Sequence, residues 1–176
     1  MEELTRLENL QKVLMEFAKD AEEIYKYQIA LGTPEFGNKN ASRKLTDSVK
    51  AIVTFGETEY EVYLELMEYW KYIECGSKGT ESSPEGAVYP AHFPPVNELI
   101  KWINVKPILP RPYNGKLPSP DTLAFLIGRK IAREGIEPFP AMATTKEELM
   151  KIYRDKISEA LGHDMEYYIK KVYDES

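Results

Sequence analysis

The chain has 176 residues, 43% of them hydrophobic and 30% charged, which is typical of a globular protein and fits a single domain over residues 1–176. No apolar run approaches the roughly 20 residues that span a bilayer, and the start at Glu2 and Glu3 lacks the pattern of a signal peptide. We therefore expect a protein made in a cytoplasm, without a membrane partner. The net charge of −6 argues against a protein that binds DNA through its phosphates, although DNA can slide past an acidic surface.

The first predicted element is a long amphipathic helix over residues 4–31, which ends before Gly32 and Pro34. Its apolar residues recur at alternating spacings of three and four, and so share one stripe: Leu7, Leu10, Leu14, Phe17, Ala21, Ile24 and Leu31. This stripe favours a helix packed on its own sheet, and a coiled-coil seam is the alternative.

A β-hairpin is predicted next, because residues 48–55 and 59–66 alternate between apolar and polar across a turn at Gly56. One face of the second strand carries the acidic row Glu59, Glu61 and Glu65. Such a row is usually a solvated face, and in a ring of subunits it could also face a basic neighbour. Because two strands alone are marginally stable, helices must back the hairpin or strands from another subunit must extend it.

The second half of the chain is predicted to be mostly helical. A short aromatic helix over residues 67–75 ends at Gly76, and a flexible loop follows over residues 77–91. Pro94 and Pro95 begin another helix, and residues 105–118 form a Pro-rich extended connector.

Two further helices complete the predicted order. Ser119 caps the first of them, and a capping box of Thr145 and Glu148 begins a long last helix that runs to about Asp174. The predicted buried stripe of this last helix consists of Leu149, Ile152, Ile157, Leu161, Met165, Ile169 and Val172. The expected class is α+β: a long N-terminal helix, a β-hairpin or small antiparallel sheet, and several helices ending in a long C-terminal one.

Residues suited to catalysis or metal binding occur without the spacing that such sites require. His92 and His163 lie on different predicted elements, and the single cysteine, Cys75, excludes an internal disulfide and a Cys-based zinc cluster. No nucleophile elbow or phosphate-binding loop is present. We predict that the protein is not an enzyme and that it has no catalytic residues, no cofactor and no metal.

Aromatic residues are concentrated around the predicted loop. Tyr69, Trp70 and Tyr72 precede it, and Phe93 and Trp102 follow it. Because aromatic side chains contribute large contact areas to cores and interfaces, we predict that these five residues organise the core or the nearest interface.

The order of several short motifs resembles that of the tail-completion or head–tail joining (neck) family of tailed bacteriophages. The first is the run of residues 45–49 before the strand pair, and the second is the run Glu-Tyr-Trp-Lys-Tyr-Ile-Glu-Cys-Gly-Ser at residues 68–77. Downstream, residues 93–96, 100–103 and 124–131 are similar to versions from phages of Bacteroidetes, including crAss-like phages. The sequence departs from the family pattern at Lys44, Cys75 and Ser77.

The resemblance implies a structural virion protein at the head–tail junction, made in the host cytoplasm. Such a protein would form a homo-oligomeric ring, six- or twelve-fold, that joins the portal protein to other neck or tail ring proteins. DNA would pass through this ring without specific binding, and the acidic row of the hairpin would face the channel or the next subunit.

Two alternatives use the same residues differently. One is a cytoplasmic tail-assembly chaperone or tail terminator of the same kind of phage. The other is a host-directed regulator or enzyme, which would need a basic face or a pocket.

Overall fold

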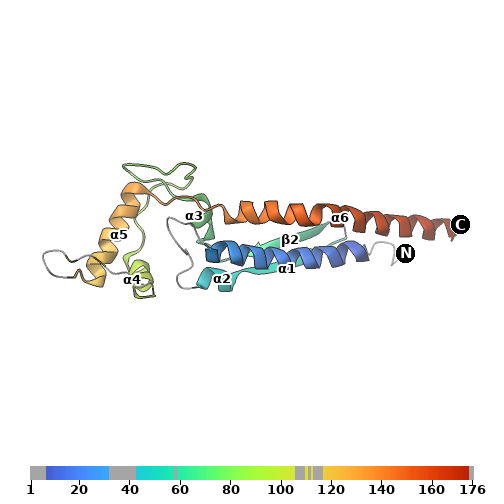
Figure 1. The fold of residues 1–176 in the computed structure, drawn as a ribbon, viewed down its shortest axis with the longest axis horizontal. Helices are drawn as coiled ribbons and strands as arrows, with labels where there is room; N and C mark the ends of the chain where they lie inside the picture. Colours follow the sequence, from blue (N-terminus) through green and yellow to red (C-terminus); the bar gives the residue numbers. More distant parts are fainter. Residues whose placement is uncertain are drawn as a thin grey trace. The chain divides into compact units, whose positions relative to one another are not determined.

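The structure is a computed structural model that describes residues 7–31, 43–57, 59–105, 110, 112 and 117–174. Its elements are α1 (Glu8–Leu31), α2 (Lys44–Ser48), β1 (Lys50–Phe55), β2 (Tyr60–Glu65), α3 (Trp70–Cys75), α4 (Val96–Val105), α5 (Pro120–Glu134) and α6 (Ala141–Asp174) (Figure 1). The predicted α+β plan, with long helices at both ends and a hairpin between them, is confirmed.

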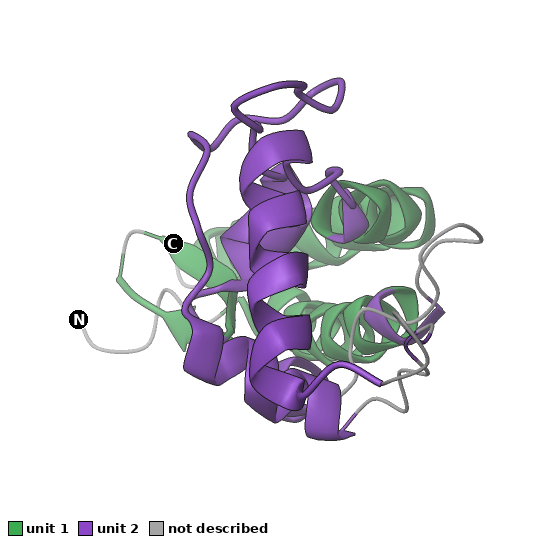
Figure 2. Ribbon diagram, turned by 90° about the vertical axis from the view of Figure 1, so that its left-hand side faces the viewer, with its two compact units in different colours: residues 1–28, 48–66, 142–176 green, residues 29–47, 67–141 purple. Residues whose placement is uncertain are grey.

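The chain divides into two compact units, which Figure 2 colours separately. The first contains residues 1–28, 48–66 and 142–176, and the second contains residues 29–47 and 67–141. Each unit is therefore built from segments that are distant in the sequence. The expectation that residues 1–176 form one domain stays a prediction beside this division.

In the first unit, α1 and α6 run antiparallel beside the hairpin (Figure 1). Three polar contacts show the direction, because residue numbers fall along α6 as they rise along α1. Asn9 meets Asp164, Asp20 meets Tyr153 and Gln28 meets Glu148. The core between these elements contains Ala21, Leu149 and Tyr153, with Val13, Phe17, Ile24, Leu64 and Ile157 packed around it. Since Leu64 belongs to β2, the prediction that the first helix packs on its own sheet is confirmed.

The long helix α6 differs from its prediction in two respects. It begins at Ala141, so that Thr145 is a buried residue inside the helix, and the predicted capping box is wrong. The predicted buried stripe is also largely wrong. Leu149 is buried, but Ile152, Leu161, Met165, Ile169 and Val172 are exposed, and the buried positions are instead Tyr153, Ala160 and Asp164. The buried face of the helix contains both polar and apolar residues, and it is therefore not the most apolar face of the helix.

In the second unit, α4 packs against α5. Ser119 caps α5 as predicted, since its hydroxyl oxygen accepts from the N–H of Thr122 at 3.2 Å. Gly128 lets the ring of Phe93 approach the helix, because a Cβ atom at this position would lie 2.7 Å from Phe93 Cζ. The same Cβ atom would lie 3.2 Å from Leu99 Cδ1 of α4, so a small residue at this position of α5 leaves room for both side chains.

The segment predicted as a flexible loop, residues 77–91, is connected by hydrogen bonds to the end of α5. Ser77 forms single β-bridges with Tyr89 and Ile136, and the N–H groups of residues 80–82 donate to the carbonyls of Ala132 and Arg133. These bonds satisfy carbonyls that the helix end leaves unpaired. The flexibility of residues 77–91 stays a prediction, and most of the predicted connector, residues 105–118, lies outside the described residues.

Candidate functional site

The hairpin of the first unit presents one face to the helices and one face outward. Its register pairs Ala51 with Leu64, Val53 with Val62 and Phe55 with Tyr60 on the inner face. The outer face carries the alternate pairs, which are Lys50 with Glu65, Ile52 with Tyr63 and Thr54 with Glu61. Directly opposed residues share a face, and the contacts of Leu64 with the core and of Tyr60 with Gln11 of α1 show which face is the inner one.

The outer face combines a half-exposed aromatic ring with charges. Tyr63 is 45% exposed, and Glu61 and Glu65 lie exposed on either side of it in β2. Glu59, in the turn, is also exposed and shares their alternation. The structure therefore places Glu61 and Glu65 on one outward surface, where Lys50 of β1 lies opposite Glu65.

The outer edges of the two strands follow from the hydrogen-bond alternation. The N–H of Ala51 donates to Glu22 Oε2 at 2.9 Å, so it points away from β2, and the N–H of Gly56 donates to Glu59 at the same distance. In an antiparallel ladder this alternation directs the backbone groups of Ala51, Val53 and Phe55 outward on β1. On β2 it directs those of Val62 and Leu64 outward. Among the residues that the structure describes, no segment pairs with either outer edge.

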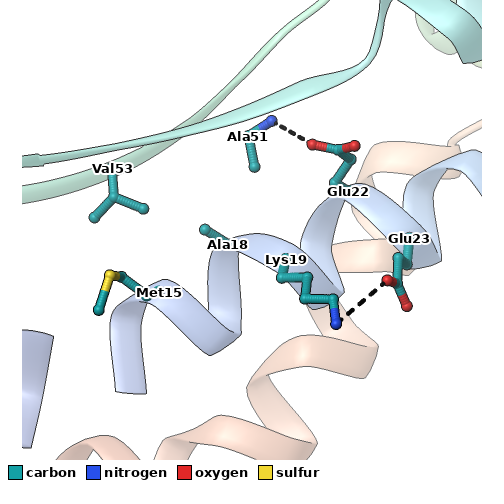
Figure 3. A pocket seen from close by; sticks show the side chains of 7 residues that line it. All are labelled: Met15, Ala18, Lys19, Glu22, Glu23, Ala51 and Val53. Carbon is teal, nitrogen blue, oxygen red and sulfur yellow. Dashed lines mark hydrogen bonds and ion pairs between the residues drawn. The ribbon is translucent and has the colours of Figure 1, made fainter. Parts of the chain in front are cut away.

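A groove of about 380 Å³ lies beside the outer edge of β1 (Figure 3). Its lining comes from α1 and β1: Met15, Ala18, Lys19, Glu22, Glu23, Ala51 and Val53. Glu22 spans the groove at one end, since it accepts from Ala51 and also from Lys26 Nζ at 2.5 Å. The Lys26 ammonium, with the Ala51 N–H, lowers the pKa of the Glu22 carboxyl below its usual 4.5. Glu22 is therefore a charged anchor between helix and strand.

The five predicted aromatic residues all belong to the second unit, where they occupy different positions. Tyr72 packs against Tyr89, with ring centroids 4.7 Å apart, and against His92. Phe93 packs against Phe125 of α5 at 5.9 Å. Tyr69 is 38% exposed at the start of α3, and its partial burial raises the pKa of its hydroxyl. Trp70 and Trp102 are half-buried. Their predicted role in a core or interface stays a prediction.

Several residues that build this site were absent from the prediction. Glu22, Met15 and Val53 line the groove, and buried Asp164 joins α6 to the start of α1. Glu22 directly follows Ala21 of the predicted stripe, but neighbouring residues of a helix point in different directions, so this adjacency does not indicate its contact with β1. Nothing local in the sequence relates Asp164 to residues 154 positions away.

Within the described part of the chain, no group of three or more histidine, cysteine, aspartate or glutamate residues could hold a metal ion. No described helix has both the length and the apolar character needed to cross a membrane. The buried hydroxyl of Tyr153 donates to Asp20 at 2.6 Å, and burial together with this contact raises its pKa. Asp20 belongs to α1 and Tyr153 to α6, so this hydrogen bond holds the two helices together.

Comparison with protein-family models, with curated proteins and with solved structures finds no match to this chain.

Proposed function

We propose that this chain is a structural subunit of the head–tail connector, or neck, of a tailed bacteriophage. Copies of it form a homo-oligomeric ring that joins the portal protein to the tail and continues the DNA channel. The observation that carries the proposal is the hairpin, a two-stranded sheet whose outer face is acidic and whose outer edges pair with no further strand among the described residues.

The order of the motifs around the hairpin supports this role. The run of residues 45–49 leads into β1, and the aromatic run of residues 68–77 comes shortly after β2 and contains α3. This order of motifs is the one that resembles the neck family. The resemblance and the hairpin thus concern the same segment of the chain.

Exposed apolar side chains on α6 also support a protein that works among neighbours. Met165 is 52% exposed, Ile169 54% and Tyr173 79%. These residues follow each other at a spacing of four, so they lie on the same side of the helix. Apolar residues gathered on one exposed face are typical of interaction surfaces.

The acidic outer face suits a channel wall. Glu61 and Glu65 would repel DNA phosphates, and a repulsive wall lets DNA slide without binding. In this arrangement the hairpin would line the passage, with the helices behind it.

The test is the protein content of purified particles of the phage that encodes the chain. We expect mass spectrometry to detect the protein in particles, and electron cryomicroscopy to locate it at the head–tail junction as a ring. A stop codon introduced at Lys50 should yield filled heads and separate tails, and suppression of that codon should restore joined particles.

Three outcomes contradict the proposal. Abundance in infected cells with absence from particles would instead indicate an assembly chaperone. A position at the distal end of the tail would exclude the neck. Unimpaired joining of heads and tails in the stop-codon phage would show that the protein is not needed for the connection.

A further inference from the structure

We infer that copies of this chain join through their hairpins, with the outer edge of β1 in one copy paired antiparallel to the outer edge of β2 in the next. This inference rests on the proposed function in one respect, namely that copies of the chain associate. It goes beyond that function in naming the contact, its register and its polarity.

The backbone groups at the two edges are complementary. Val53 directs its N–H and carbonyl outward from β1, and Val62 directs its own outward from β2. When these two residues are placed opposite each other, they exchange two hydrogen bonds. The pairing between copies then repeats the register inside the hairpin, and each residue again faces the type of residue that it faces within its own chain.

Charge selects this pairing over pairing of two β2 edges. Across a β1–β2 junction, Lys50 lies opposite Glu65 of the neighbouring copy, and Ile52 lies opposite its Tyr63. Opposite charges and apolar–aromatic pairs across strands are stabilising. A junction of two β2 edges would instead place Glu61 against Glu65 or Glu59 against Glu65, and like charges in direct opposition are destabilising. The ion pair therefore favours a junction of unlike edges.

The groove beside β1 leaves space for the incoming strand. Met15 and Ala18 form an apolar part of its lining next to Val53 (Figure 3). The inner-face side chain of Val62 from the neighbouring copy would lie over this groove. Glu22 closes one end by holding the Ala51 N–H, so the junction is centred on Val53.

The widths of the layers indicate that such a sheet curves. Two paired strands are about 10 Å wide, whereas two packed helices are roughly 20 Å wide. Repeated side by side, the helices need more room than the strands, so the strands take the inside of the curve. A contact between unlike edges that curves in this way can close into a ring, with the outer face of each hairpin toward the centre.

The experiment blocks one edge at a time in the full-length protein. Val53→Pro removes the outward N–H of β1, and Val62→Pro removes that of β2. Proline is tolerated where an edge N–H points away from its own ladder, so each hairpin should persist. Val53→Ala and Val62→Ala are the matched controls, because they shorten the same side chains and retain the N–H. Analytical ultracentrifugation measures assembly, and circular dichroism checks the fold.

The expected result distinguishes the polarity of the contact. Each proline variant alone should be monomeric, and an equimolar mixture should form a one-to-one dimer, since one variant retains an intact β1 edge and the other an intact β2 edge. The alanine variants should assemble like the wild type. In a Cys75→Ser background, chains carrying Ile52→Cys should form disulfides with chains carrying Tyr63→Cys, which tests the same register without proline.

Four results would overturn the inference: dimers of either proline variant alone, wild-type assembly by both proline variants, no disulfide between the two cysteine variants, or a wild type that stays monomeric at its highest soluble concentration. These results concern assembly in solution, and the particle content tests the neck function separately. Rings that persist in both proline variants would contradict the strand pairing but not the neck function. Absence of the protein from phage particles would contradict the neck function, and the strand pairing could still be measured in solution.

Discussion

Asp164 shows how a single buried carboxylate can connect the two ends of the chain. It is 4% exposed and accepts from the N–H of Leu10 at 2.9 Å and from the backbone and side chain of Asn9. These N–H groups belong to the first turn of α1, which has no acceptors of its own and favours a negative charge. Asp164 therefore acts as an N-terminal cap supplied by another helix.

The loss of this cap should be measurable as a loss of stability. We expect Asp164→Ala to lower the free energy of unfolding by about 3 kcal/mol, because it leaves several partly buried donors unsatisfied. Urea unfolding followed by circular dichroism measures this change. Asp155→Ala, at an exposed position of the same helix, is the control and should stay within about 0.5 kcal/mol of the wild type. Equal effects of the two substitutions would contradict the capping role.

Glu22 should make part of the stability depend on pH. Its lowered pKa in the folded chain stabilises the fold above the unfolded value near 4.5, and this contribution disappears as the pH falls through the folded value. The melting temperature of Glu22→Gln should therefore differ most from that of the wild type at neutral pH and converge with it in acid.

Lys26→Met is the control for this assignment, because Lys26 is the main cause of the lowered pKa. In chains that carry Lys26→Met, the effect of Glu22→Gln on the melting temperature should vary less with pH. An effect that is constant with pH in both backgrounds would show that Glu22 acts only through packing or neutral hydrogen bonds.

At the scale of elements, α6 is the clearest case in which apolar pattern and burial diverge. Its exposed face carries Leu161, Met165 and Ile169, while Tyr153 and Asp164 on its buried face have polar groups that meet partners on α1. A polar group can be buried when a partner satisfies it. The partner lies far away in the sequence, so the pattern of α6 alone favours the wrong face.

Two truncations on α6 test which residues of the predicted stripe lie in the core. Leu149→Ala should lower the free energy of unfolding by about 2–5 kcal/mol, since Leu149 is 4% exposed in the core cluster. Met165→Ala should change it by no more than about 0.5 kcal/mol in the isolated chain. Both values come from urea denaturation. A loss at Met165 as large as that at Leu149 would contradict the exposed position of Met165.

Strand β2 of the hairpin is the element in which local pattern and burial agree. Tyr60, Val62 and Leu64 alternate with exposed residues, and the helices cover the alternating side as expected. Alternation with period two depends only on the pleat of a strand, so it is visible without knowledge of the partner. The positions of Glu61 and Glu65 on one face follow for the same reason.

For the whole molecule, the proposed neck function makes the sign of charge on the hairpin important. Glu61→Lys would place a cation on the outer face, where it could bind DNA phosphates in the channel. We expect particles with this substitution to assemble and to release their DNA more slowly in vitro, with the delay reduced at high salt.

Glu61→Gln is the matched control, because it removes the negative charge without adding a cation. It should release DNA at nearly the wild-type rate. If Glu61→Lys particles release DNA as fast as the wild type at low salt, the outer face of the hairpin does not line the passage.

The sequence by itself determined the elements whose signals are local: the long first helix, the hairpin with its acidic row, the Ser119 cap and the order of helices after it. Each of these depends on periodicity or on neighbours a few residues apart. Only the tertiary structure decided the buried face of α6, the cap that Asp164 supplies to α1, and the groove that Glu22 spans beside β1. These features depend on contacts between segments that are distant in the sequence. A polar residue can be buried only when another segment of the chain supplies its hydrogen-bond partner.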